Sequence, residues 1–311
     1  MTTNQIPLGS VVVGVDGSEH GDRALDWAAR HAELEHRTVA IVHCADTQVV
    51  RAGEWVELSG IDRSRLDTAL EGAAQQVLAK ARARVRATRP GVDTIGIVSH
   101  DDARVALTDA SARAHLVVLG SRGRGRLASS LLGSVSASVV KHASCAVVVS
   151  RPTVARQPRA NRVVVGADLA GPGGAALEFA FAEASLRRWP LTIMPSTVER
   201  EGSALASELV ACHADAPGLE GLRLGMAESL AGLEAKYPDV AVTRDLSCGL
   251  VDECVAGRSP AAALLVVGRP LAAGRRWLAH QSAALLVVEH AHTDVVVVPE
   301  AGTVGATGPA H

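Results

Sequence analysis

The chain has 311 residues, a net charge of −2, 48% hydrophobic side chains and an aromatic content of only 2%. Domains commonly contain about 100–200 residues, so this length indicates two domains. The near-neutral charge and the scarcity of aromatic rings argue against nucleic acid as a partner. The sequence shows no membrane-spanning stretch and no secretory signal, and its five cysteines form no CxxC pair. We therefore expect a cytoplasmic protein without a membrane or nucleic-acid partner.

The sequence contains one long internal repeat. The segment Val11–Asp16 (VVVGVD) recurs at Val163–Asp168 (VVVGAD), and Leu116–Gly120 recurs at Leu264–Gly268. A period of about one domain indicates duplicated domains rather than a solenoid of short repeats. A segment with prolines and without periodicity separates the copies. We expect a first domain over residues 1–151, a linker over 152–161 and a second domain over 162–311.

The first copy alternates short β-branched runs with helical patterns. Strands are expected at Val11–Val15, Val39–His43, Thr94–Val98, Leu116–Leu119 and Ala146–Ser150. Helices are expected at Asp22–Glu35, Leu66–Arg86, Ala103–Ala114 and Leu127–Lys141. The strands are continuous apolar runs, which is typical of parallel strands covered on both faces. The fold class is therefore α/β with a parallel sheet, and right-handed crossovers place helices on both faces.

The helical spacing also predicts which side chains are buried. In the first helix, Leu25, Ala28 and Ala32 share one face. In the second, the predicted buried face is Ala69, Ala73, Val77, Ala81 and Val85.

The second copy repeats this scheme of strands and helices. Its strands are expected at Val163–Ala167, Leu191–Met194, Ala241–Leu246, Leu264–Val267 and Val295–Val298. Its helices are expected at Gly174–Arg188, Ser207–Lys236, Asp252–Arg258 and Arg275–His290. The chain is thus predicted to form two tandem doubly wound domains.

The glycine-rich segment Gly120–Ser136 follows a buried strand directly. Gly120 and Gly123 allow backbone N–H groups to approach an anion such as a polyphosphate, although a plain glycine turn explains them as well. Gly133 lies inside the next helical pattern, where glycine costs about 1 kcal/mol. Either the helix begins near Ser134, or a ligand packs closely there. Both alternatives present N–H groups and the Ser134 hydroxyl to an anion at a positive helix end.

A second polar strand end follows Val11–Val13. Here Gly14 and Asp16 precede Gly17 and Ser18. In doubly wound sheets, ligands bind where the strand order reverses, outside the carboxyl ends of two neighbouring strands. Asp16 is therefore a candidate ligand for a ribose hydroxyl or for a metal carried by phosphates. The alternative is that Asp16 and Ser18 only cap the following helix.

These residues together resemble the universal stress protein family. The spacing Gly120-x2-Gly123-x9-Gly133-Ser134 matches the nucleotide-binding pattern of that family, G-x2-G-x9-G-[ST]. The resemblance extends over Val11 to about Arg151 and more weakly over Arg162 to Pro299. The whole chain is therefore similar to tandem universal stress proteins of actinobacteria.

The resemblance implies a five-stranded sheet of order 3-2-1-4-5 in each domain and ATP as the ligand, usually with Mg²⁺ or Mn²⁺. It implies that the backbone at Cys44 contacts the adenine and that Asp16 lies against the nucleoside. The ribose and phosphates would be held by the motif residues Gly120, Gly123, Gly133, Ser134 and Val135. It also implies edge-to-edge pairing through the fifth strands, Ala146–Ser150 and Val295–Val298, and hence a homodimer as one possible assembly.

The second copy departs from the family pattern. Leu271 stands at the position of Gly123 and Gln281 at that of Gly133, whereas Gly268 and Ser282 are kept. Asp168 is followed by Leu-Ala in place of Gly-Ser. Bulky side chains where phosphate approaches the backbone predict one functional nucleotide site per chain, in the first copy.

Other functions fit the sequence less well. A Walker A lysine and a Gly-x-Ser-x-Gly nucleophile motif are both missing from the sequence. Gly123–Ala128 resembles a dinucleotide loop but follows the fourth strand rather than the first. The expected function is a nucleotide-responsive regulator or stress-survival factor with an unidentified protein partner, in which ATP orders the loop Ser121–Leu132. The alternatives are a slow ATPase or phosphotransferase, and a scaffold with both sites empty.

Two smaller features have ordinary explanations. Asp101 or Asp102, after the third strand, is expected to cap a helix, although the neighbouring His100 also makes a metal site conceivable. The arginines Arg122, Arg124 and Arg126 are suited to neutralise phosphate or to form a solvated loop.

Overall fold

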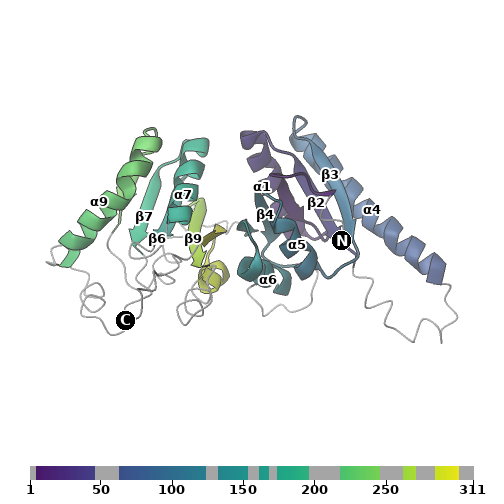
Figure 1. The fold of residues 1–311 in the computed structure, drawn as a ribbon. Helices are drawn as coiled ribbons and strands as arrows, with labels where there is room; N and C mark the ends of the chain where they lie inside the picture. Colours follow the sequence, from purple (N-terminus) through teal and green to yellow (C-terminus); the bar gives the residue numbers. More distant parts are fainter. Residues whose placement is uncertain are drawn as a thin grey trace, which may run out of the picture. The chain divides into compact units, whose positions relative to one another are not determined.

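The computed structural model describes residues 5–45, 63–123, 132–152, 161–167, 174–195, 218–245, 262–270 and 284–300. Its contacts divide the chain into two compact units, Met1–Pro152 and Thr153–His311 (Figure 1). The predicted linker residues 153–160 lie outside the described part of the chain.

The first unit contains a parallel five-stranded sheet. The strands are β1 (Val11–Gly14), β2 (Val39–Cys44), β3 (Thr94–Ser99), β4 (Leu116–Gly120) and β5 (Ala146–Ser150). They are arranged in the order β3-β2-β1-β4-β5, and the register places Val11 beside both Val39 and Leu116. The α/β fold class and the order 3-2-1-4-5 are therefore confirmed.

Two pairs of helices cover this sheet. Helix α1 (Glu19–Glu35) packs against α4 (Arg63–Thr88), and α5 (Ala103–Ser111) packs against α6 (Ser134–His142). Along the chain, the sheet grows from β1 to β3 in one direction and then through β4 and β5 in the other. Because each crossover is right-handed, this reversal places one helix pair on each face of the sheet (Figure 1). The side chains of Val11, Val12 and Val13 are fully buried between these layers.

The buried face of α1 is the predicted one, and that of α4 is not. Leu25, Ala28 and Ala32 are buried, as their spacing indicates. In α4, Ala69 and Ala73 are exposed and Val77 is half-buried, although Ala81 and Val85 are buried as predicted. The core positions preceding these two are Ala74 and Leu78. Alanine is common on both faces of this helix. The apolar pattern therefore fits two alternative buried faces, which differ by a shift of one residue along the helix.

Helix α6 begins later than the expected helix Leu127–Lys141. Its first residue is Ser134 and Gly133 is its N-cap, with an extended ψ of 148°. Leu132 and Gly133 are not helical, whereas residues 124–131 lie outside the described part. The structure thus favours a helix start at Ser134 over a glycine within a helix.

The second unit has the same topology. Its strands are β6 (Val163–Ala167), β7 (Leu191–Pro195), β8 (Val242–Arg244), β9 (Leu264–Pro270) and β10 (Asp294–Glu300). They are parallel in the order β8-β7-β6-β9-β10, which is again 3-2-1-4-5 within the unit. Its helices include α7 (Gly174–Arg187), α9 (Gly218–Lys236) and a helical segment over 284–290. The expected helix Asp252–Arg258 lies outside the described residues.

The C-terminal end of α1 is fixed to the amino-terminal ends of β1 and β4. The Arg37 side chain donates a hydrogen bond of 2.8 Å to the carbonyl of Gly9 and another to the Glu35 carboxylate. Burial by itself would raise the pKa of Glu35, but hydrogen bonds from His115 and Arg37 outweigh it and lower the pKa to about 2. The Glu35 carboxylate is therefore ionised at neutral pH.

The N-cap of α5 provides a test of this fold. The Asp102 carboxylate accepts a hydrogen bond of 2.8 Å from the Arg104 amide, and the Arg104 side chain lowers the pKa of Asp102 to about 2. We predict that Asp102→Ala lowers the free energy of unfolding by about 1 kcal/mol at pH 7, measured by urea denaturation. The stabilisation by Asp102 is complete above its ordinary pKa of 3.8 and is lost as the pH falls towards 2, so the difference should shrink over that range.

The matched control is Asp67→Ala, at an exposed position in α4. It should change the free energy of unfolding by no more than about 0.5 kcal/mol. Equal losses in the two variants would contradict the capping role of Asp102.

Candidate functional site

A cavity lies in the first unit at the carboxyl ends of β1 and β4. Neighbouring strands β1 and β4 are followed by helices on opposite faces of the sheet, so the chain leaves a crevice between their ends. The cavity has a volume of about 460 Å³. It brings together all eight residues that the sequence predicts for the nucleotide site: Gly14, Asp16, Cys44, Gly120, Gly123, Gly133, Ser134 and Val135.

A tight turn after β1 positions Asp16. Gly17 has a φ of +76°, a conformation that glycine adopts without steric cost. The Asp16 carboxylate accepts a hydrogen bond of 3.0 Å from the Ser18 amide, and the Ser18 hydroxyl accepts one of 3.1 Å from the Gly21 amide. Ser18 is thus the N-cap of α1, whereas Asp16 stabilises the turn and also lines the cavity.

The exit of β4 requires glycine because α1 approaches it closely. A Cβ atom added to Gly120 would lie 2.7 Å from the His20 carbonyl oxygen. A Cβ on Gly123 would lie 2.9 Å from an Asp16 carboxylate oxygen, so the two strand exits meet at this point. The close packing of the protein itself therefore explains Gly120, without reference to a ligand.

Gly133 has a different role, because neither its backbone nor its neighbours require glycine. Its φ is −70°, and an added Cβ would have only ordinary contacts, the nearest at 3.5 Å to the Arg122 Cα. Gly133 caps α6 without a side-chain hydrogen bond. The first amides of a helix have no partner within the helix. The small size of Gly133 thus keeps the amide-bearing end of α6 open to the cavity, where Ser134 and Val135 also lie.

Hydrogen bonds fix the end of α6 against the exit of β4. The buried Ser136 hydroxyl donates to the Gly120 carbonyl at 2.7 Å, and the Gly133 amide donates to the Ser121 carbonyl at 2.8 Å. Both ends of the loop Ser121–Leu132 are therefore anchored. The prediction that ATP orders this loop concerns mainly residues 124–131, which lie outside the described part of the chain.

The charges around the cavity are mixed. Arg122 and Asp16 both line it. Burial is the main cause that lowers the pKa of the nearby His20, and the positive charges of Arg23 and Arg122 lower it further. The His20 imidazole is therefore neutral at pH 7, and its Nδ1 lies 3.3 Å from the Ser121 hydroxyl. Arg122 and the α6 amides leave this part of the cavity favourable for an anion.

Apolar side chains also line the cavity. Cys44 and Val42 contribute from β2, and Leu119 from β4. Ala103 and Leu107 of α5 also line the cavity, although no sequence pattern predicts them as site residues. The position of these two side chains in the cavity lining depends on how α5 crosses the sheet, and this crossing cannot be predicted from a local sequence pattern. Such an apolar wall is suited to a flat, mostly apolar ring.

The second unit differs at the corresponding strand exit. A Cβ on Gly268, the counterpart of Gly120, would lie 2.5 Å from the Glu300 carboxylate. That carboxylate accepts a hydrogen bond of 3.3 Å from the Ala176 amide near the start of α7. The second unit therefore places a carboxyl group of its own at this strand exit. Its departures at Leu271 and Gln281 and after Asp168, and the retained Ser282, lie outside the described residues.

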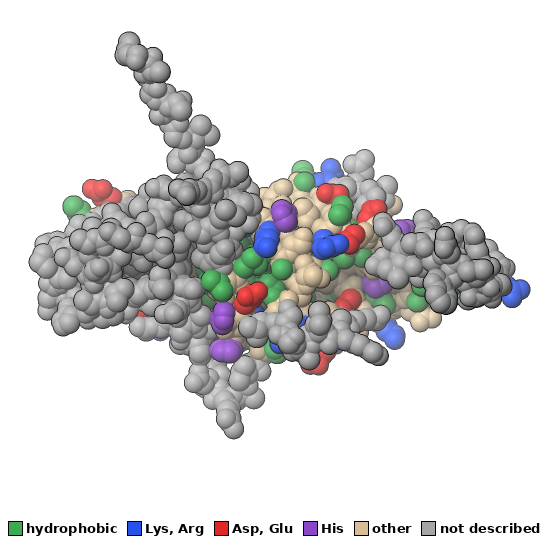
Figure 2. Space-filling view, turned by 90° about the horizontal axis from the view of Figure 1, so that it is seen from below, with side chains coloured by type: hydrophobic (Ala, Val, Ile, Leu, Met, Phe, Trp, Pro, Cys, Tyr) green, Lys and Arg blue, Asp and Glu red, His purple; other side chains and the backbone are tan. Residues whose placement is uncertain are grey.

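The surface carries charges of both signs. On the face shown in Figure 2, the acidic and basic side chains of the described residues are interspersed. No helix among the described residues is both long enough and apolar enough to cross a membrane.

Comparisons with known proteins identify the family. Residues 8–151 match the model of the universal stress protein family. A universal stress protein of Mycobacterium tuberculosis is 33% identical over 280 residues, covering 86% of this chain and 87% of the relative. One of Mycobacterium bovis is 31% identical over 311 residues, covering 92% and 96%.

A solved structure supports the same assignment of the fold. The universal stress protein from Archaeoglobus fulgidus has a TM-score of 0.66 at 18% identity and covers 96% of this chain and 98% of its own. The sequence relatives span nearly the whole chain and both of its units. The chain therefore belongs to the universal stress protein family.

Proposed function

We propose that the first unit binds ATP in the cavity between the ends of β1 and β4, and that the protein is a nucleotide-responsive regulator. The observation that carries this proposal is the convergence of all eight predicted residues on one cavity. Its volume of about 460 Å³ is within the range of roughly 300–1,000 Å³ usual for small-molecule sites.

The chemistry of the walls suggests how ATP would be oriented. The adenine would lie against the apolar wall, with its edge at the backbone of Cys44. Asp16 would accept a hydrogen bond from a ribose hydroxyl, and the phosphates would lie at the amides of Ser134 and Val135 with Arg122 nearby. Two separate kinds of wall, one apolar and one rich in amides, match the two ends of a nucleotide.

A divalent ion fits this arrangement as a companion of the nucleotide. Among the described lining residues, Asp16 supplies the only carboxylate. Mg²⁺ and Mn²⁺ commonly bind through one or two carboxylates together with phosphate oxygens. The ion would therefore enter with ATP and would neutralise phosphate charge close to Asp16.

The asymmetry between the units favours one nucleotide per chain. In the first unit, the exit of β4 faces Arg122 and open amides, whereas in the second the exit of β9 faces the Glu300 carboxylate. A fixed carboxylate at this position would repel a polyphosphate. Pairing through the fifth strands, the stress-response role and the cytoplasmic location stay predictions from the resemblance.

Gly133→Leu tests the site. The backbone at Gly133 is compatible with a side chain, so we expect the variant to fold, but leucine would fill the approach to α6. We predict loss of ATP binding in isothermal titration calorimetry with no more than a small change in the melting temperature. The matched control is Gly72→Leu, at an exposed position in α4 with no atom near its Cβ, which should bind ATP normally. Normal ATP affinity in folded Gly133→Leu would refute the assignment.

Stoichiometry tests the asymmetry. Nucleotide released from the purified, denatured protein, or counted by titration to saturation, should amount to one ATP per chain. Two ATP molecules per chain, or one ATP that remains bound in the Gly133→Leu variant, would indicate binding in the second unit and would contradict the proposal.

Amide hydrogen exchange with and without ATP tests the regulatory part. The amides of Ser134 and Val135 should gain protection on binding, since they would donate to phosphate. Equal exchange at saturating ATP would contradict this role. Steady phosphate release that is lost in Ser134→Ala would instead favour the alternative of a slow ATPase or phosphotransferase.

A further inference from the structure

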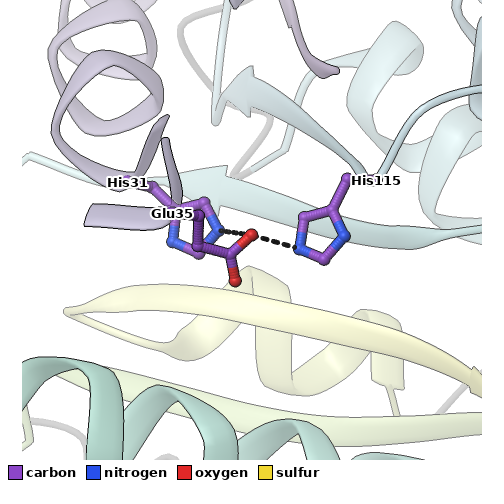
Figure 3. Close-up of side chains that lie close together, drawn as sticks. All are labelled: His31, Glu35 and His115. Atoms are coloured by element: carbon purple, nitrogen blue, oxygen red, sulfur yellow. Dashed lines mark ion pairs between the residues drawn. The ribbon is translucent and has the colours of Figure 1, made fainter. Parts of the chain in front are cut away.

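Two histidines and a glutamate meet at the other end of the first unit. His31 and Glu35 are one turn apart on α1, and His115 directly precedes β4. Figure 3 shows the Glu35 carboxylate between the two imidazole rings. One of its oxygens lies 3.0 Å from His115 Nε2 and 3.8 Å from His31 Nε2. None of the three residues belongs to a motif that the sequence predicts.

The separations of the donor atoms suit a tetrahedral metal ion. One donor atom from each of the three residues lies within 4.8 Å of the other two. With metal–ligand bonds of about 2.0–2.1 Å, neighbouring donors around Zn²⁺ are roughly 3.3 Å apart. Two of the three donor separations, 3.0 and 3.8 Å, fall on either side of that value, and the third, between the histidine nitrogens, is within 4.8 Å.

The surroundings hold the donors in place. The fully buried His31 ring stacks on Trp27 with centroids 5.1 Å apart, and it also stacks on His115 at 6.0 Å. The backbone amide of His115 donates to the Ser10 carbonyl at 2.9 Å. Side chains that are already ordered lose little entropy when they bind a metal. Glu35 and His115 keep 22% and 28% of their side-chain surface exposed, which leaves an entry path.

Arg37 is compatible with a metal bound to Glu35. Its side chain is anchored on the Gly9 carbonyl and hydrogen-bonded to the carboxylate. Arg37 donates to Oε2, the same oxygen that lies near the two imidazoles. A carboxylate oxygen has two lone pairs, so Oε2 can accept from Arg37 with one and bind a metal with the other. Ligating carboxylates commonly have such an outer hydrogen-bond partner, which fixes their orientation.

We propose that His31, Glu35 and His115 form a Zn²⁺ site that clamps the C-terminal end of α1 to the start of β4. Two imidazoles and one carboxylate are a donor set that zinc accepts, with a fourth position left for water. The site is independent of the proposed nucleotide site. His31 lies twelve residues beyond Glu19, about 18 Å along α1, so the two sites are at opposite ends of that helix.

The experiment titrates ZnCl₂ into the full-length, chelator-treated protein without nucleotide, by calorimetry in a buffer that does not bind metals. We expect one Zn²⁺ per chain and a rise in melting temperature with zinc concentration, because a ligand that binds only the folded state stabilises it. Co²⁺ should give the visible absorption of a four-coordinate ion, and excess Mg²⁺ should not compete, since it prefers oxygen donors.

His115→Gln is the principal variant, because His115 is partly exposed and its loss should leave the core intact. It should lower zinc affinity at least about 10-fold. Removing only a hydrogen-bond partner of a metal ligand already costs about this much, and His115 is proposed as a ligand itself. The matched control is His142→Gln, an exposed histidine at the end of α6, which should leave zinc binding unchanged. Failure of the wild-type protein to bind zinc, or equal affinity in His115→Gln, would overturn the proposal whatever the outcome for ATP.

Discussion

The organisation of the first unit depends on the reversal of strand order between β1 and β4. The chain leaves β1 towards one face of the sheet and β4 towards the other, so their carboxyl ends are not covered by a shared crossover. The approach of α1 to Gly120, where a Cβ would come within 2.7 Å of a backbone carbonyl, closes one side of the resulting crevice. The turn at Gly17 and the start of α6 at Ser134 close the others.

The glycines of the family pattern serve different physical purposes. Gly120 and Gly123 are needed because backbone or a carboxylate approaches them closely, with or without a ligand. Gly133 has ordinary backbone angles and ordinary contacts, so its small size matters for the space that it leaves at the end of α6. A substitution at Gly133 is therefore compatible with folding, whereas one at Gly120 is not.

The two units share one topology but differ at the strand exit that carries the conserved glycine. Both keep the strand order 3-2-1-4-5, because the apolar strands that specify it are kept in both copies. In the second unit, the Glu300 carboxyl group lies beside both Gly268 and the start of α7.

The strands and the duplication could be read from the amino-acid pattern, because they depend on continuous apolar runs that recur at one long period. The glycines and polar residues at the ends of β1 and β4 could be read from their short spacings, whereas Cys44 and Val135 were predicted through the resemblance to the family. The sequence did not determine the buried face of α4, where alanines on both sides made the pattern ambiguous. Only the tertiary structure placed Ala103 and Leu107 in the cavity wall, Glu300 over Gly268, and His115 beside His31 and Glu35. Each of these contacts joins residues far apart in the chain, and such pairs are set by how helices cross the sheet rather than by any local periodicity.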